Sequence, residues 1–179
     1  MNLLREYIRE FLITEYSPAH SPEKRIVYRG MKITMPSAKL AGLVRKYVRT
    51  GDVSGASPNE LVRVVLGQLQ NESTGESWSL DFDVAASFAG AWEATNRGKE
   101  LHVIFQAVVD EEAGYDPQAA DEEPGMFYDE SEVRFKPGTK IPLTGIYVFI
   151  KSKDEWAKQR SQYIPLMIKA EGNPMMVKA

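Results

Sequence analysis

The feature that most constrains the fold is an alternating run between residues 101 and 109. Apolar side chains occupy every second position of this run, from Leu101 to Val109. This period of two is typical of a β-strand that buries one face. A chain with several such strands has to cover their apolar faces with a second layer. Further runs that we interpret as strands lie at 24–31, 77–80, 132–135 and 140–150.

Apolar residues recur at helical spacing in the N-terminal half. An amphipathic helix is expected over residues 1–16, two helices should follow Ser37 and the segment 57–60, and a further helix should follow Asp81 or Asp83. The segment 57–60 reads Ser-Pro-Asn-Glu, a capping box with proline at the first helical position. We therefore predict one α+β domain over residues 1–179, with a frayed tail at 166–179. The apolar stripe of the first helix consists of Leu4, Tyr7, Ile8, Phe11 and Leu12.

The composition excludes several kinds of chemistry. The chain has no cysteine and only two histidines, so thiol nucleophiles and thiolate zinc sites are ruled out, and no metal site is expected. His102 faces away from the apolar side of its strand and is expected at the surface. The net charge of −3 is unlike that of a general nucleic-acid binder, and no run is long enough to span a membrane, so neither partner is expected. Because Arg5, Glu6 and Arg9 interrupt the apolar N-terminus, we expect no signal peptide and a cytoplasmic location.

Acidic residues are concentrated between Asp110 and Glu132. This segment holds ten of the 25 acidic residues of the chain and none of its 22 basic residues. A solvated acidic loop is the ordinary interpretation of such a segment. It leads directly into Glu130 and Glu132, which would project to the same side of a strand that starts there. Two carboxylates on one side favour a cation between them, such as a substrate, a developing positive charge or a structural arginine. The simpler interpretation is a solvated strand edge.

Two other short motifs carry polar groups on predicted strands. Arg29 is followed by Gly30, and a fixed guanidinium beside exposed backbone suits a phosphate or a carboxylate. Arg29 could equally pair with a structural acid. Ser77 and Ser79 would present two hydroxyls on one face, which could orient a carboxylate or simply face solvent.

The order of these motifs resembles the R-S-E class of mono-ADP-ribosyltransferases, which includes arginine-modifying bacterial toxins, vertebrate ecto-enzymes and bacteriophage enzymes. That family has an arginine on an early strand, a Ser-Thr-Ser strand and a Glu-x-Glu before a late strand. The resemblance covers about residues 26–150. It rests on Tyr28-Arg29-Gly30, on Ser77-Trp78-Ser79 with the following Asp81, Val84, Ala85 and Phe88, and on Glu130-Ser131-Glu132 with Val133 and the turn at 137–139.

The resemblance implies a core of two mostly antiparallel sheets split around a cleft for NAD, with helices from the N-terminal half alongside. NAD would be a co-substrate, and no metal would be needed. By this resemblance, Arg29 would contact an NAD phosphate and the backbone of Gly30 would contact the nicotinamide amide. Ser77 would hold the catalytic glutamate, and Ser79 would support that strand. Phe88 would lie against the nicotinamide-ribose end.

The resemblance also implies the reaction. Glu132 would be the catalytic residue that binds the ribose hydroxyl, and Glu130 would direct transfer of ADP-ribose to an exposed arginine of a protein acceptor. Such an enzyme could be a toxin-like or phage effector acting in the cytoplasm of a host cell. Trp78 replaces the usual threonine, and its indole could point into the core or reshape the pocket. Two other functions remain open: an NAD glycohydrolase on the same fold, and a non-catalytic module whose acidic loop binds a basic protein.

Overall fold

A computed structural model of the chain describes residues 23–71, 77–113, 132–136, 138–153, 158, 162–169 and 174–178. The helix expected at 1–16 and Glu130 lie outside the described residues, as does most of the acidic segment. None of the described helices is long and apolar enough to cross a membrane.

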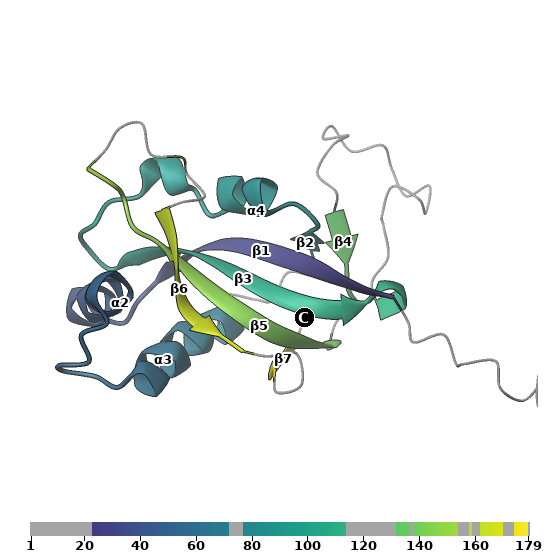
Figure 1. The fold of residues 1–179 in the computed structure, drawn as a ribbon, viewed down its shortest axis with the longest axis horizontal. Helices are drawn as coiled ribbons and strands as arrows, with labels where there is room; N and C mark the ends of the chain where they lie inside the picture. The colour runs from purple at the N-terminus through teal and green to yellow at the C-terminus, as the bar shows by residue number, and fades with distance from the viewer. Residues whose placement is uncertain are drawn as a thin grey trace, which may run out of the picture.

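The described strands form one antiparallel sheet, so the α+β class is confirmed (Figure 1). The sheet order is β4-β2-β1-β3-β5-β6, and β7 also pairs with β5. Two separate sheets were expected, but the pair Tyr28 and Ser79 joins β2 and β4 to the larger group of strands. The two-sheet core was implied by the resemblance, and the described strands instead form a single sheet. The seven strands are β1 (Lys24–Thr34), β2 (Ser77–Ser79), β3 (Glu100–Asp110), β4 (Glu132–Arg134), β5 (Lys140–Phe149), β6 (Tyr163–Ile168) and β7 (Met175–Lys178).

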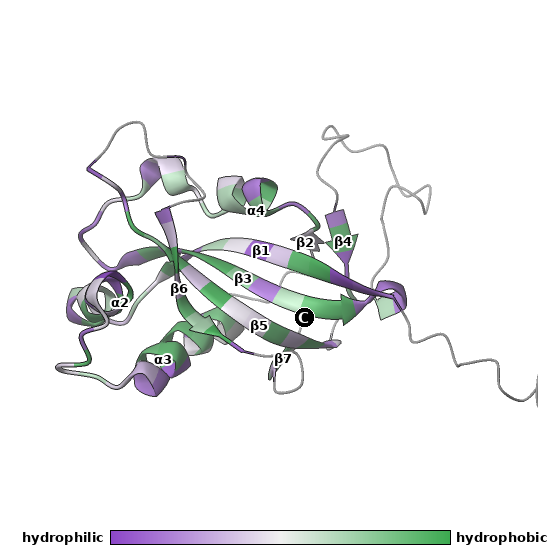
Figure 2. Cartoon of the chain, viewed as in Figure 1, coloured by the Kyte–Doolittle hydropathy of each residue, from purple (hydrophilic) through white to green (hydrophobic). Residues whose placement is uncertain are grey.

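Strands β1 and β3 form the centre of the sheet and pair along their whole length, from Lys24 opposite Asp110 to Thr34 opposite Glu100. Gly30 was expected to close the first strand, but β1 continues four residues beyond it to Thr34. The alternating run at 101–109 lies on β3, and Figure 2 shows polar and apolar stretches along β1, β3 and β5.

Two long helices cover one face of the sheet. Helix α2 (Ala38–Thr50) begins where the Ser37 hydroxyl accepts a hydrogen bond from the Leu40 amide, 3.2 Å away, and Gly51 ends it with a φ of 70°. Helix α3 (Pro58–Asn71) has the predicted capping box. In it the amide of Ser57 donates to Glu60 at 2.7 Å and the amide of Glu60 donates to the Ser57 hydroxyl at 3.3 Å.

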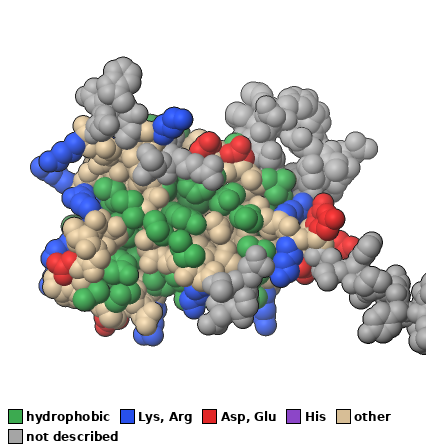
Figure 3. All heavy atoms as spheres, in the orientation of Figure 1, with side chains coloured by type: hydrophobic (Ala, Val, Ile, Leu, Met, Phe, Trp, Pro, Cys, Tyr) green, Lys and Arg blue, Asp and Glu red, His purple; other side chains and the backbone are tan. Residues whose placement is uncertain are grey.

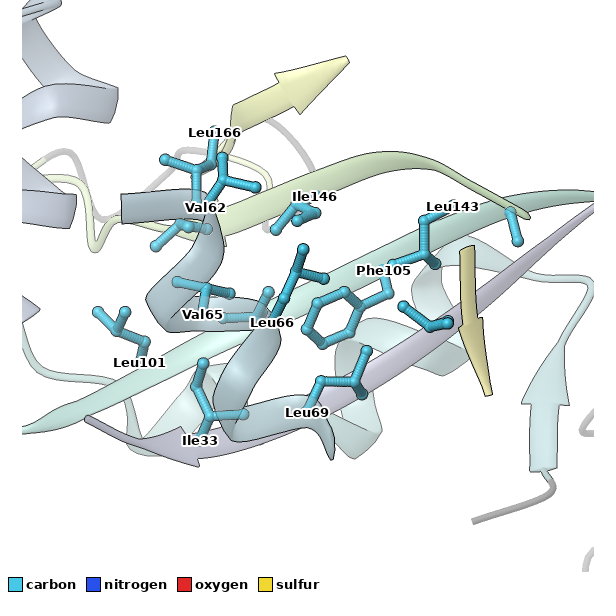
Figure 4. Close-up of a cluster of buried hydrophobic side chains, with 14 of the residues drawn as sticks. Ile33, Val62, Val65, Leu66, Leu69, Leu101, Phe105, Leu143, Ile146 and Leu166 are labelled. Atoms are coloured by element: carbon cyan, nitrogen blue, oxygen red, sulfur yellow. The ribbon is translucent and has the colours of Figure 1, made fainter. Parts of the chain in front are cut away.

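Apolar side chains of α2 and α3 pack against the sheet to form the main core, and Figure 4 shows the part of it between α3 and the strands. Residues of β1, β3 and β5 that share one face meet residues of α3, which is why period-two and helical patterns both appear in the sequence. Buried members of this core include Ile33, Val62, Val65, Leu66, Leu69, Leu101, Phe105, Leu143, Ile146 and Leu166.

A short helix covers part of the opposite face. Helix α4 (Phe82–Phe88) and the 3₁₀ turn η1 (Ala91–Glu93) lie against β1 and β3, on the other side of the sheet from α2 and α3 (Figure 1). A second 3₁₀ turn, η2 (Glu111–Ala113), follows β3.

The C-terminal part of the chain forms the outer edge of the sheet. Strand β6 pairs with residues 145–149 of β5, and β7 pairs with residues 140–143 of the same strand. Between them the Lys169 amide donates to the Thr144 carbonyl at 2.8 Å. The two strands therefore act as one interrupted edge strand. The prediction of a frayed tail at 166–179 was wrong for β7 and for the end of β6.

Candidate functional site

Three neighbouring strands bring the predicted motifs together. Ser79 on β2 is paired with Tyr28 on β1 on one side and with Glu132 on β4 on the other. About fifty residues separate each motif from the next in the sequence, so only the pairing of the strands makes them neighbours. Directly opposed residues share a face of the sheet, and Glu132, Ser79 and Tyr28 therefore lie on the same face.

This row of opposed residues continues across the whole sheet. On the far side of Tyr28, the pairing runs through β3 and β5 to β6. The face that carries the candidate catalytic glutamate is thus the face that α4 only partly covers. In order, the row is Glu132, Ser79, Tyr28, Gln106, Gly145 and Ile168.

Glu132 is held by an arginine of its own strand. The Nε atom of Arg134 donates to Oε1 of Glu132 at 3.0 Å, and Nη2 lies 3.5 Å from Oε2. The Glu132 side chain is 21% exposed and that of Arg134 is 42% exposed. A structural arginine beside these carboxylates was one of the expectations from the sequence, but Arg134 was not identified as that residue. Arg134 follows Glu132 by two residues, which already places both side chains on one face of the strand. Glu130 lies outside the described residues, so its placement beside Glu132 stays a prediction.

The two serines of the second motif differ in position. Ser79 is buried and lies opposite Glu132, while its hydroxyl accepts a hydrogen bond from the Asp81 amide at 2.9 Å. Ser77 is exposed and lies opposite Arg134. The register therefore places Ser79, rather than Ser77, directly across from the candidate catalytic residue.

Trp78 points into the core, on the side away from Glu132. Its ring packs edge to face against Phe135 with centroids 6.2 Å apart, and the residue is 4% exposed. The indole N–H is buried and meets no hydrogen-bond acceptor in the described part of the chain. Of the two possibilities left by the sequence, the structure shows the first.

Arg29 lies on β1 beside the row but faces the other side of the sheet. Its Nε atom donates to the sulfur of Met31 at 3.3 Å, and Met31 packs against the main core. Within the described ranges no carboxylate pairs with the guanidinium, and burial lowers the pKa of Arg29. A partly buried guanidinium without a paired acid is suited to bind an anion.

Gly30 is where α4 meets the sheet. A Cβ atom built at Gly30 would lie 1.5 Å from the carbonyl oxygen of Ala85 and 2.9 Å from the amide nitrogen of Ala89, so no other residue fits beneath the helix. The carboxylate of Asp81 caps this helix by accepting from the Asp83 amide at 2.6 Å. Phe88, the last residue of α4, is 57% exposed, so its ring is free for a ligand.

An aromatic cluster fixes the start of α4. The ring of Phe82 packs edge to face on Tyr28, Tyr147 and Tyr163, with centroids 5.3, 6.0 and 5.6 Å away. Burial raises the pKa of Tyr163, whose hydroxyl points toward the Ala86 carbonyl at 3.5 Å. The cluster connects the helix after the serine motif to the strand that carries Arg29.

His102 supports the end of the same helix. The expectation that it lies at the surface was wrong, because it is 3% exposed beneath α4 and η1. Its Nδ1 atom lies 2.6 Å from the Ala89 carbonyl oxygen, so Nδ1 carries the proton and donates it. The sequence pattern had placed His102 on the face opposite the core correctly, but it did not show that this face is covered there.

Over the part of the chain that the structure describes, no three His, Asp or Glu side chains converge as a metal site would require. Comparison with protein-family models, with curated proteins and with solved structures finds no match to this chain.

Proposed function

We propose that the chain is a mono-ADP-ribosyltransferase that moves ADP-ribose from NAD to arginine side chains of a protein and releases nicotinamide. The observation that carries the proposal is the adjacency of β1, β2 and β4, which makes the strands of the three motifs neighbours and places Ser79 directly across from Glu132. We further infer that the single pair joining β1 to β2 marks the division between two halves of the sheet and the cleft for NAD.

In this proposal NAD binds along the edge of β1. Beyond Tyr28, no strand in the described ranges pairs with this edge of β1, so the backbone near Gly30 is available to the nicotinamide amide. Because Arg29 faces the other side of the sheet from Glu132, NAD has to pass around this edge of β1 for Arg29 to supply a cation for its phosphates. The exposed ring of Phe88 covers the nicotinamide-ribose end. The absence of a glycine-rich dinucleotide fingerprint in the sequence agrees with such a mode of binding.

The proposed chemistry uses carboxylates only. The bond between C1′ of the ribose and the nicotinamide nitrogen breaks, its electron pair leaves with nicotinamide, and positive charge develops on the sugar. Glu132 stabilises that charge, as a carboxylate does in glycoside hydrolysis. A guanidinium nitrogen of the acceptor then bonds to C1′ and loses one proton to solvent, while Glu130 aims the guanidinium. Glu132 has to bind the ribose hydroxyl while it stays near Arg134, whose pairing preorients the carboxylate.

The test separates the roles of the two glutamates. Purified chain is incubated with labelled NAD, with free agmatine as a small guanidine acceptor, and with a protein mixture. Glu132→Gln should abolish both nicotinamide release and labelling, whereas Glu130→Gln should retain nicotinamide release and lose labelling. Glu112→Gln, which removes an exposed carboxylate of η2 within the acidic segment 110–132, should leave both activities intact.

Other outcomes would contradict the proposal. Nicotinamide release without any labelled acceptor in the unmodified chain would indicate the glycohydrolase instead. Absence of both signals, together with no heat on titration with NAD, would indicate a binding module. Equal loss of both activities in the two glutamate variants would refute the division of roles.

A further inference from the structure

One face of the sheet stays partly uncovered. Ile26 is 46% exposed and Ile168 is 67% exposed, and both lie on the face that carries Tyr28 and Gly145. Figure 3 shows apolar side chains gathered over the middle of the molecule in this region. We call this surface the open face and define it by the exposed Ile26 and Ile168 and by the half-buried Tyr28, Val108 and Tyr147, of which the two tyrosines also contact Phe82 of α4.

The open face is unlike the solvent face of an ordinary antiparallel sheet. Such a face carries mainly polar side chains. Here the polar group between the apolar residues is Gln106, whose amide oxygen accepts from the Tyr147 hydroxyl at 3.0 Å and whose amide nitrogen donates to Thr144 at 3.2 Å. Because these polar groups form hydrogen bonds with one another, they do not require water as a partner, and the surface is suited to contact with another apolar surface.

The start of the described chain lies next to this surface. The carbonyl of Glu23 accepts a hydrogen bond from the Glu111 amide at 2.7 Å, which fixes that residue beside the first row of β1 and β3. The 22 residues before it include the apolar positions from Leu4 to Leu12, which recur at helical spacing. The six residues 17–22 can span up to roughly 20 Å. The open face extends only about three strand spacings, or roughly 14 Å, from β1 to β6.

We propose that the segment 4–12 packs its apolar stripe on the open face of the same molecule. The stripe and the surface are each apolar, and the tether is long enough to join them without strain. A second copy of the chain is a poorer occupant, because five side chains are far fewer than the roughly 20–30 residues a side of a stable protein interface. The proposal is independent of the catalytic function, although it places the segment on the face that leads to Glu132.

Photo-crosslinking in the full chain tests this contact. Since the chain has no cysteine, Phe11→Cys can be labelled uniquely with a benzophenone maleimide and irradiated. The matched control is Glu6→Cys, because residue 6 would lie on the opposite side of a helix from the stripe. An equal mixture of isotopically labelled and unlabelled protein separates crosslinks within a molecule from those between molecules.

We expect the label at position 11 to crosslink within the molecule to peptides of β1, β3 or β6, and the label at position 6 to do so several-fold less. Crosslinks to α2 or α3, crosslinks between molecules, equal yields from both positions or no crosslinks at all would each overturn the proposal. A thermal measurement adds a second criterion. Phe11→Ser and Ile26→Ser should each lower Tm, and the double variant should lose less than the sum, whereas additive losses would also overturn it.

Discussion

Replacing Gly30 with alanine should displace α4 from the sheet. The new Cβ would lie 1.5 Å from the Ala85 carbonyl oxygen, 2.6 Å from its carbon and 2.9 Å from the Ala89 nitrogen, whereas ordinary contact begins at 3.4 Å. Strand β1 cannot move away because it is paired with β3 along its whole length. The helix must therefore shift by roughly 2 Å.

The size of the effect follows from what the helix buries. Overpacking of a core by one methyl group costs about 1–3 kcal/mol. A displaced helix would also loosen Phe82 from its three aromatic partners, and complete loss of a buried phenylalanine costs about 3–5 kcal/mol. We expect Gly30→Ala to lower the free energy of unfolding by about 3 kcal/mol. For a chain of this size that corresponds to a Tm lower by roughly 6–12 °C.

Urea unfolding followed by circular dichroism measures this loss. The control is Gly67→Ala in α3, where an added Cβ meets nothing within 4 Å. This change should raise stability by about 0.5–1 kcal/mol, because alanine is the better helix former. If Gly30→Ala unfolds within about 0.5 kcal/mol of the unmodified chain, the account of how α4 docks on Gly30 is wrong.

Three further predictions concern other parts of the fold. Arg45→Met should lower stability by about 2–3 kcal/mol in urea unfolding, since the buried guanidinium donates to the carbonyls of residues 97, 98 and 100; an unchanged midpoint would contradict this. Trp78→Phe should change stability by less than about 1 kcal/mol, because it keeps the contact with Phe135 and removes an indole N–H that has no acceptor among the described residues, whereas Trp78→Ala should cost about 3–5 kcal/mol. The ion pair with Lys46 and hydrogen bonds from Ser54 hold the pKa of Asp52 well below its usual range. The ionised Asp52 therefore contributes its full stabilisation of the fold above the unfolded pKa of about 3.9, and this stabilisation is lost as pH falls through the lower folded pKa. The difference in Tm between the unmodified chain and Asp52→Asn should be present at neutral pH and shrink in acid.

Local structure was predictable wherever a local signal exists. Ser37 and Ser57 mark the starts of α2 and α3. Each serine hydroxyl accepts a hydrogen bond from the backbone amide three residues later, so the whole signal lies within four consecutive residues of the sequence. The alternation at 101–109 located β3, although residues 101–105 are buried on both faces because α4 and η1 cover the second face there.

What could not be predicted depends on residues far apart in the sequence. Pairing of β1 with β2 is decided by one contact, Tyr28 with Ser79, and no local pattern reports it. Gly30 appears in the sequence as a strand end, yet its small size is needed by a helix that begins about fifty residues later. His102 is buried for the same reason. The sequence shows that Arg134 shares a face with Glu132, because it follows Glu132 by two residues. Only the structure shows that they form an ion pair.

The interrupted edge formed by β6 and β7 has a consequence for solubility. A long, regular edge strand offers its unpaired backbone groups to any other chain, and proteins that aggregate commonly do so at such edges. Here the edge is broken between Ile168 and Met175, and Pro165 in the middle of β6 has no N–H to donate. At the other end of the sheet β4 has only three residues. An incoming strand would find few consecutive hydrogen-bonding positions along β4 or across the break between β6 and β7, which disfavours growth of the sheet at these two edges.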